Sequence, residues 1–130
     1  MKPPRSLPAI IRALVFIVLL HAHSFADVPP GQKAEVEHLL DFVRDSGCVI
    51  DRNGSRHPGN EAVNHIRRKY DHFRNKIKST EDFIDFSASR STLSGEAYEV
   101  TCLGMRAIGT RRWLLEELES FRAGRKAKKR

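Results

Sequence analysis

Two cysteines, Cys48 and Cys102, constrain this chain more than any other feature, because they are the only ones among its 130 residues. A bridge between them would close a loop of 55 residues. Such a bridge restricts the unfolded chain by about 4 kcal/mol, before any strain in the folded state is subtracted. Two buried free thiols or a pair of metal ligands are the alternatives. We expect the disulfide, because the start of the chain predicts export to an oxidising compartment.

Residues 1–26 have the three parts of a secretory signal peptide. Three basic residues lie in the first twelve positions, residues 13–20 are an unbroken apolar run, and Ser24 and Ala26 are small residues at the −3 and −1 positions. An uncleaved anchor is the alternative, but a spanning helix needs about 20 apolar residues. We expect Sec-dependent export, cleavage after Ala26, and a periplasmic or secreted protein that meets the membrane only through this segment before cleavage.

The formal net charge of +7 is unevenly distributed. Without residues 1–26 the net charge is +4, and six of the remaining basic residues lie in 122–130. Residues 27–120 carry 14 basic and 16 acidic side chains, so this part is close to neutral. We interpret 122–130 as a disordered basic tail, with attraction to an anionic surface as the alternative. We expect no nucleic-acid partner for an exported protein.

The first half of the exported chain predicts a helix, a strand and a second helix. A helix over about 32–45 is indicated by an apolar stripe of Val36, Leu39, Leu40 and Val43. Residues 48–52 alternate as a short strand before Asn53 and Gly54, a dipeptide typical of tight turns. Asn60 is a candidate N-cap for a helix that runs from Glu61 to Lys76 or Ile77. Its expected buried face consists of Ala62, Ile66, Tyr70, Phe73 and Ile77.

The second half predicts a short helix from Ser79, a polar loop over 87–95, a strand over 96–103, a loop over 104–109 and a final helix. We expect Thr110 to cap this last helix, which ends near Phe121. The order of elements is then α-β-α-α-β-α. It predicts a small, single α+β domain over residues 27–121, with a two-stranded sheet packed on helices. We expect it to be a monomer.

Five separated blocks of the sequence resemble the YfeK-like family of small exported bacterial proteins. The blocks are residues 48–54, 62–69, 80–84, 91–98 and 113–114. The resemblance spans about residues 35–120 and implies export and a shared fold, but no activity, because the family is one of unknown function. This chain departs from the family where Arg56 and His57 replace an aromatic residue, and where Thr92 replaces a serine. The aromatic departure puts in doubt any binding through that position.

The candidate binding residues combine this resemblance with the chemistry of the side chains. They are Arg52, Asn53, Gly54, His65, Lys69, Ser91, Ser94 and Tyr98. Arg52 could hold an anion through its guanidinium fork, and His65 could donate, accept or carry a proton. The serine-rich loop could hold a sugar or a peptide through its hydroxyls. The alternative is structural: the Asn53-Gly54 pair serves its turn, and His65 holds the strand against the helix.

The leading functional hypothesis is a non-enzymatic envelope module that binds a partner protein, an envelope polymer or a small anion. It is favoured because the sequence contains no recognisable catalytic motif. The alternative is a small envelope hydrolase or acid/base enzyme that uses His65 and Glu61, which stand four residues apart on one helix. A metal site at His57, Glu61, His65 and His72 lacks the usual His-x-x-x-His spacing. We expect no metal and no cofactor.

Overall fold

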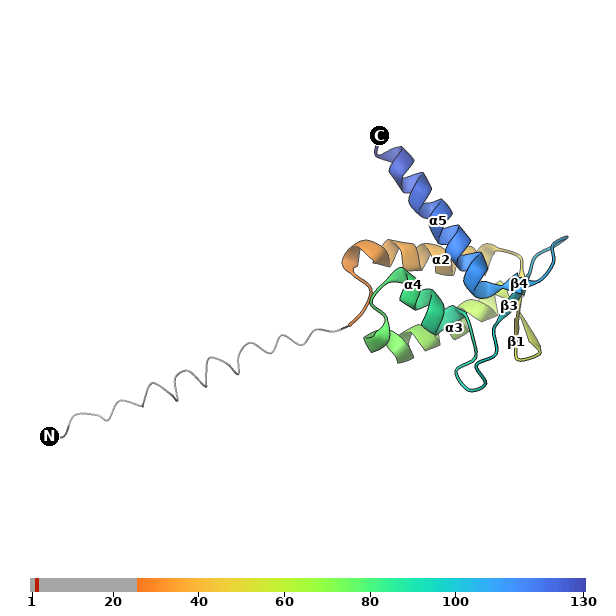
Figure 1. Ribbon diagram of the computed structural model, residues 1–130, viewed down its shortest axis with the longest axis horizontal. Helices are drawn as coiled ribbons and strands as arrows, with labels where there is room; N and C mark the ends of the chain where they lie inside the picture. The colour runs from red at the N-terminus through yellow and green to blue at the C-terminus, as the bar shows by residue number, and fades with distance from the viewer. Residues whose placement is uncertain (1, 3–25) are drawn as a thin grey trace.

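A computed structural model describes Lys2 and residues 26–130 of the chain. The predicted signal peptide and its cleavage therefore lie almost wholly outside the described residues. The described part is an α+β domain in which four α-helices pack beside one four-stranded antiparallel sheet (Figure 1). The predicted α+β class is confirmed, whereas the predicted two-stranded sheet is wrong because two further short strands flank the central pair.

The sheet has the order β2-β1-β3-β4. Its strands are β1 (Val49–Arg52), β2 (Ser55–Pro58), β3 (Glu99–Thr101) and β4 (Ile108–Gly109). Strands β1 and β3 are antiparallel neighbours with Val49 opposite Thr101. The residues next to this pair, Cys48 and Cys102, form the predicted disulfide, which is therefore confirmed. Such a bridge is consistent with an oxidising compartment outside the cytoplasm.

Strand β2 lies in a segment for which the sequence predicted no element, and it exists because of the turn that precedes it. Asn53 has φ 53° and Gly54 has φ 78°. A two-residue hairpin turn with positive φ at both positions folds the chain tightly back on itself. Residues 55–58 therefore pair with β1 over its whole length.

Helices α2 (Lys33–Asp45) and α3 (Gly59–Phe73) form the main helical layer. α2 follows a 3₁₀ turn, η1 (Pro30–Gln32), and buries the predicted apolar stripe. α3 begins before the predicted position, and its N-cap is Pro58 rather than Asn60. The early start brings Gly59 against the last turn of α2, where the missing side chain leaves room for the backbone of Val43. α3 ends in a 3₁₀ turn, η2 (Arg74–Lys76).

The short helix predicted at Ser79 is confirmed, but it is longer than expected. Ser79 caps α4 (Thr80–Phe83) by accepting a hydrogen bond from the amide of Asp82. The chain then continues as a π-helical segment, η3 (Ile84–Ala88), so the predicted polar loop is wrong for residues 87–88. Ser87 is fully buried there.

The last helix, α5 (Thr110–Lys128), differs from the prediction at both ends. Its N-cap is Gly109. The buried hydroxyl of Thr110 instead donates a hydrogen bond of 2.6 Å to the carbonyl of Ala88, so it joins two elements rather than capping one. The helix also continues past Phe121, where the sequence predicted its end, and its last part projects beyond the domain (Figure 1).

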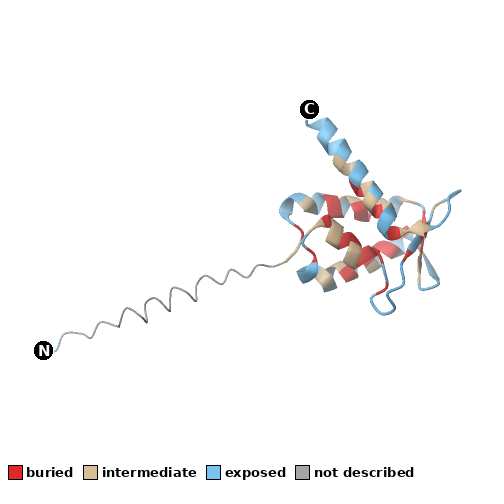
Figure 2. Ribbon diagram, viewed as in Figure 1, coloured by how far each residue is buried: buried red, intermediate tan, exposed pale blue. Residues whose placement is uncertain are grey.

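The core lies between the inner faces of the helices and the central strands, where buried residues gather in Figure 2. The largest fully buried side chains include Leu39, Ile77, Phe83, Leu114 and Leu118. The projecting end of α5 is exposed on all sides. Among the described residues, no helix is both long and apolar enough to span a bilayer.

Candidate functional site

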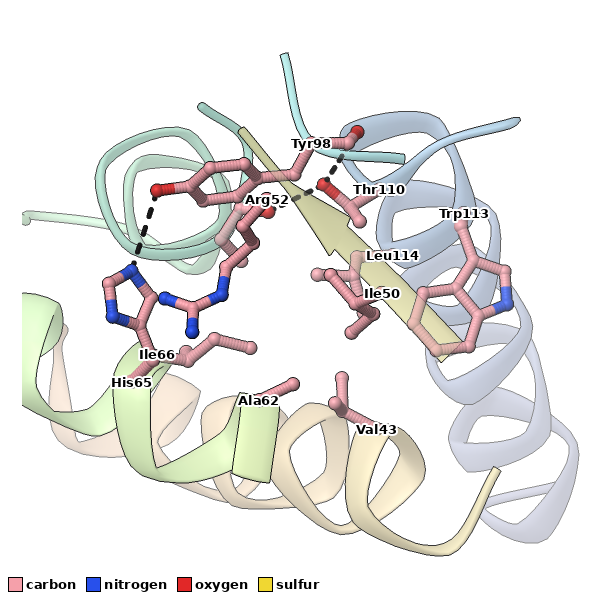
Figure 3. A pocket seen from close by; sticks show the side chains of 11 residues that line it. Val43, Ile50, Arg52, Ala62, His65, Ile66, Tyr98, Thr110, Trp113 and Leu114 are labelled. Atoms are coloured by element: carbon pink, nitrogen blue, oxygen red, sulfur yellow. Dashed lines mark hydrogen bonds between the residues drawn. The ribbon is translucent and has the colours of Figure 1, made fainter. Parts of the chain in front are cut away.

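Four of the eight predicted binding residues come together where β1, α3 and the start of β3 meet. We call them the basic cluster: Arg52, His65, Lys69 and Tyr98. The Nε2 atom of His65 lies 3.4 Å from the Tyr98 hydroxyl, and the Lys69 ammonium lies 5.1 Å from the centre of the Tyr98 ring. Figure 3 shows the Arg52 guanidinium beside His65 on the same side of a small pocket. Two of the four, His65 and Lys69, are brought together by the sequence itself, because they lie one turn apart on α3.

Arg52 is the most unusual member of the basic cluster. It is the last residue of β1 and is partly buried. Its Nε atom is fully covered and has no hydrogen-bond partner in the part of the chain that the structure describes. Within residues 26–130, no carboxylate forms an ion pair with it. Burial lowers the pKa of Arg52, and the nearby Arg68 acts in the same direction, whereas Tyr98 and Glu61 act in the opposite direction.

The other members of the cluster are shifted by burial and by their charged neighbours. Burial, followed by repulsion from Arg52 and Lys69, lowers the pKa of His65 to about 4. Lys69 is only 9% exposed, and burial, helped by Arg52 and Arg90, lowers its pKa as well. Burial raises the pKa of the Tyr98 phenol. At neutral pH the cluster therefore contains two cations, a neutral imidazole and a protonated phenol.

The pocket in Figure 3 is too small to enclose a ligand. Its volume is about 10 Å³, which is roughly the space of one water molecule. Ile50, Trp113 and Leu114 form its apolar side, while Arg52 and His65 form the polar side. The basic cluster can therefore act only on a group that approaches from the protein surface.

The other four predicted residues form a second, outer group that joins the β1–β2 turn to the serine-rich loop. The Ser94 hydroxyl donates a hydrogen bond of 3.1 Å to the side-chain oxygen of Asn53. The Ser91 hydroxyl accepts one of 3.2 Å from the Ser94 amide. Gly54 completes the tight turn, and its amide donates to the Asp51 carboxylate. These contacts shape the two loops beside the basic cluster.

The catalytic pair considered from the sequence is not assembled. The Glu61 carboxylate lies 3.3 Å from Nδ1 of His57, and His65 instead contacts Tyr98. A general base works best with a pKa near the working pH, and His65 with a pKa of about 4 is a weak base at neutral pH. In the part of the chain that the structure describes, no three His, Cys, Asp or Glu side chains are grouped as metal ligands would be.

The structure also reveals a groove that the sequence reasoning missed. It is bordered by Lys69 and has a volume of about 490 Å³. We call it the Arg90 groove, and it is lined by Lys69, Phe73, Asp85, Phe86, Arg90, Ser91, Thr92 and Gly95. One signal in the sequence could have indicated it, since Arg90 is the single charged residue of the polar segment 87–94.

Comparison with known proteins supports the resemblance noted from the sequence. Residues 30–122 match a family described as a family of unknown function, DUF5329. The chain is also 34% identical over 85 residues to the uncharacterized protein YfeK of Salmonella typhimurium (strain LT2), a match that covers 65% of this chain and 71% of that protein. No solved structure matches. The chain therefore belongs to the DUF5329 family and is a relative of YfeK.

Proposed function

We propose that this protein is a non-enzymatic binding module of the bacterial envelope, and that its basic cluster holds an anionic group of its partner. The disulfide supports an oxidising location. The small internal pocket and the separation of His65 from Glu61 favour binding over catalysis. The partner's anionic group could belong to a protein, an envelope polymer or a small molecule.

Arg52 is the observation that carries this proposal. A partly buried guanidinium without a counterion is unfavourable, because desolvation of a charge is not repaid by an ion pair. In most proteins, buried polar groups of this kind have a hydrogen-bond partner. Exceptions concentrate at functional sites, where stability is given up for activity or binding. A carboxylate or phosphate from a partner would supply the missing counterion and would also relieve the repulsion between Arg52 and Lys69.

Inorganic phosphate is a suitable probe, and His65 reports its binding. A bound anion cancels part of the positive field that lowers the pKa of His65, so adding phosphate should raise that pKa from about 4. The measurement is an NMR titration of the His65 imidazole, at constant ionic strength, with and without phosphate. Arg52→Gln should abolish the effect of phosphate.

The matched control is Arg112→Gln, which removes an equal charge from a side chain that is 75% exposed and paired with Glu116. This variant should respond to phosphate as the unmodified protein does. A His65 pKa that phosphate leaves unchanged would contradict the proposal. So would a response that survives in Arg52→Gln.

A further inference from the structure

We propose that the Arg90 groove binds a carboxylate that carries an aromatic ring. Lys69 and Arg90 would hold the carboxylate, and the ring would lie against Phe73 and Phe86. This inference deepens the proposed binding function and rests on it in one respect, since Lys69 belongs both to the groove and to the basic cluster. It names the chemistry of the group that the protein would receive.

The size of the groove is the first argument. Its volume of about 490 Å³ lies within the range of roughly 300–1,000 Å³ that is usual for small-molecule sites. The pocket between Arg52 and the core holds only about 10 Å³. A ligand anchored near Lys69 therefore has room in the groove and none on the inner side.

The charge of the groove is the second argument. Lys69 and Arg90 are both cations, and their proximity contributes to the lowered pKa of Lys69. The only acidic side chain of the lining, Asp85, accepts a hydrogen bond of 2.6 Å from Arg111 and is thereby neutralised. Arg90 is exposed, and no carboxylate of residues 26–130 pairs with it. The groove thus offers two cations to an anion.

The orientation of Lys69 suits a ligand in the groove. Its ammonium donates one hydrogen bond, of 2.5 Å, to the backbone carbonyl of Arg90. An ammonium has three donors, so two can be offered elsewhere. The same bond fixes the position of the loop that carries Arg90, which is closed by an antiparallel bridge between Arg90 and Ala97. The Lys69 ammonium is therefore held beside the backbone of Arg90 before any ligand arrives.

The aromatic side of the groove is the third argument. The rings of Phe73 and Phe86 have centroids 5.7 Å apart and planes tilted by 35°. Both side chains are only partly buried, although they line the groove from different elements, α3 and η3. A further aromatic ring can pack favourably against these two rings in an edge-to-face or an offset-stacked arrangement. An aromatic ring is thus the apolar group that best complements this surface.

Two sources share this chemistry: a free aromatic acid and the C-terminal residue of a peptide that ends in an aromatic side chain. Calorimetric titration can separate them. The first probe is 3-phenylpropanoate, with propanoate lacking the ring and 3-phenylpropanamide lacking the charge. The second is the tripeptide Ala-Ala-Phe, with a free or an amidated C-terminus.

We expect 3-phenylpropanoate to bind at least about tenfold more tightly than either truncated probe, since both the charge-assisted hydrogen bonds and the ring contact contribute. Tighter binding of the free-acid tripeptide, lost on amidation, would identify a peptide end as the ligand. Equal affinities for 3-phenylpropanoate and for the free-acid tripeptide would identify a small aromatic acid as the ligand. In either case Arg90→Gln and Phe86→Leu should each weaken binding about tenfold.

Arg106→Gln is the matched control, because Arg106 is also an exposed arginine and lies on the loop between β3 and β4. This variant should bind as the unmodified protein does. Retained melting temperatures show that the variants fold. Equal affinity for the acid and its amide, or affinity that Arg90→Gln leaves unchanged, would overturn the inference. The proposed function is judged separately, because phosphate binding is read from the pKa of His65. A His65 pKa that rises with phosphate, together with no binding of 3-phenylpropanoate, would refute the groove proposal alone.

Discussion

His65 and Tyr98 meet through a contact of 3.4 Å between Nε2 and the phenol oxygen, and this contact links α3 to the residue before β3. Burial raises the pKa of Tyr98, so the phenol keeps its proton at neutral pH. His65, with a pKa of about 4, is neutral there. The phenol can therefore donate to a neutral imidazole, and protonation of His65 in acid would remove that acceptor.

The first prediction concerns the pH dependence of stability. The folded-state pKa of His65 is about 4, below the ordinary value of 6.5, so between these values the unfolded chain binds more protons than the folded chain. The free energy of unfolding should therefore rise with pH over this range and fall as the solution is acidified. Urea denaturation at pH 4.5 and pH 7 measures this difference. It should be smaller in His65→Asn than in the unmodified protein.

The control for this experiment is His72→Asn, which removes an exposed histidine from the last turn of the same helix. It should keep the pH dependence of the unmodified protein. The interpretation of His65 would be wrong if both variants lost the dependence equally.

The second prediction is that Arg52→Met makes the protein more stable. The substitution removes a partly buried charge without a counterion, and the gain should be about 1 kcal/mol in the free energy of unfolding. Arg112→Met removes an exposed charge and should change stability by less than about 0.5 kcal/mol. A large loss of stability in Arg52→Met would show instead that Arg52 serves the fold.

The fold could be predicted from the sequence where burial leaves a periodic pattern. The stripe of Val36, Leu39, Leu40 and Val43 identified α2, and the Asn-Gly turn marked the end of β1. Strand β2 left no such pattern because none of its residues is buried. Its pairing comes from the turn alone. β4 has only two residues, which is too short for any alternation to be visible.

The candidate site was predictable in part for the same kind of reason. His65 and Lys69 stand one turn apart on α3, so their proximity follows from local structure, whereas the approach of Arg52 from β1 depends on packing. The Arg90 groove depends on the packing of Phe73 on α3 against Phe86 on η3, two elements whose contact no local pattern specifies. The prediction that Thr110 caps the last helix was wrong for a similar reason. Its hydroxyl donates a hydrogen bond to the carbonyl of Ala88 on another element rather than within its own helix.

The third prediction concerns Arg122, which lies in the segment expected to be disordered. Its guanidinium forms two hydrogen bonds of 2.9 Å with the Glu35 carboxylate and one of 2.5 Å with Glu81. The Glu35 side chain is only 8% exposed. Arg122→Met would leave that carboxylate buried without its partner and should lower the free energy of unfolding by about 3 kcal/mol.

Thermal unfolding of Arg122→Met at neutral pH measures this loss, with Lys128→Met as the control at an exposed position of the same helix. Arg122 also lowers the pKa of Glu35. Its contribution to stability should therefore be present at neutral pH and should disappear as the pH falls through the lowered pKa. Equal stability of the two variants at neutral pH would refute a structural role for Arg122.

The fourth prediction concerns the disulfide between Cys48 and Cys102, which are 54 positions apart. Replacing both cysteines with serine should lower the free energy of unfolding by about 3–4 kcal/mol, because the unfolded chain regains the freedom of a long loop. Guanidinium denaturation of the double variant measures the loss. The bridge lies at the end of the β1–β3 pair, away from the Arg90 groove. A variant that remains folded should therefore still bind in that groove, and loss of binding by a folded variant would contradict this separation.

The fifth prediction is that one substitution, glycine to alanine, has opposite effects at two helical positions. At Gly59 a Cβ atom would collide with the carbonyl oxygen of Val43 and lie 3.1 Å from that of Arg44. Because both neighbours are backbone atoms, α2 and α3 would have to move apart, at a cost of about 2–3 kcal/mol. At Gly124 nothing lies within 4 Å of the added atom, so alanine should stabilise α5 by about 0.5–1 kcal/mol.

Urea denaturation of Gly59→Ala and Gly124→Ala gives both signs in one experiment. Two changes of the same sign would show that helix propensity, and not the close approach of α2 and α3, decides the result at Gly59. The packing at Gly59 also affects the basic cluster, because α3 carries His65 and Lys69. A shift of α3 away from α2 should also move the imidazole relative to Tyr98. Gly59→Ala should therefore alter the pKa of His65, whereas Gly124→Ala should leave it unchanged.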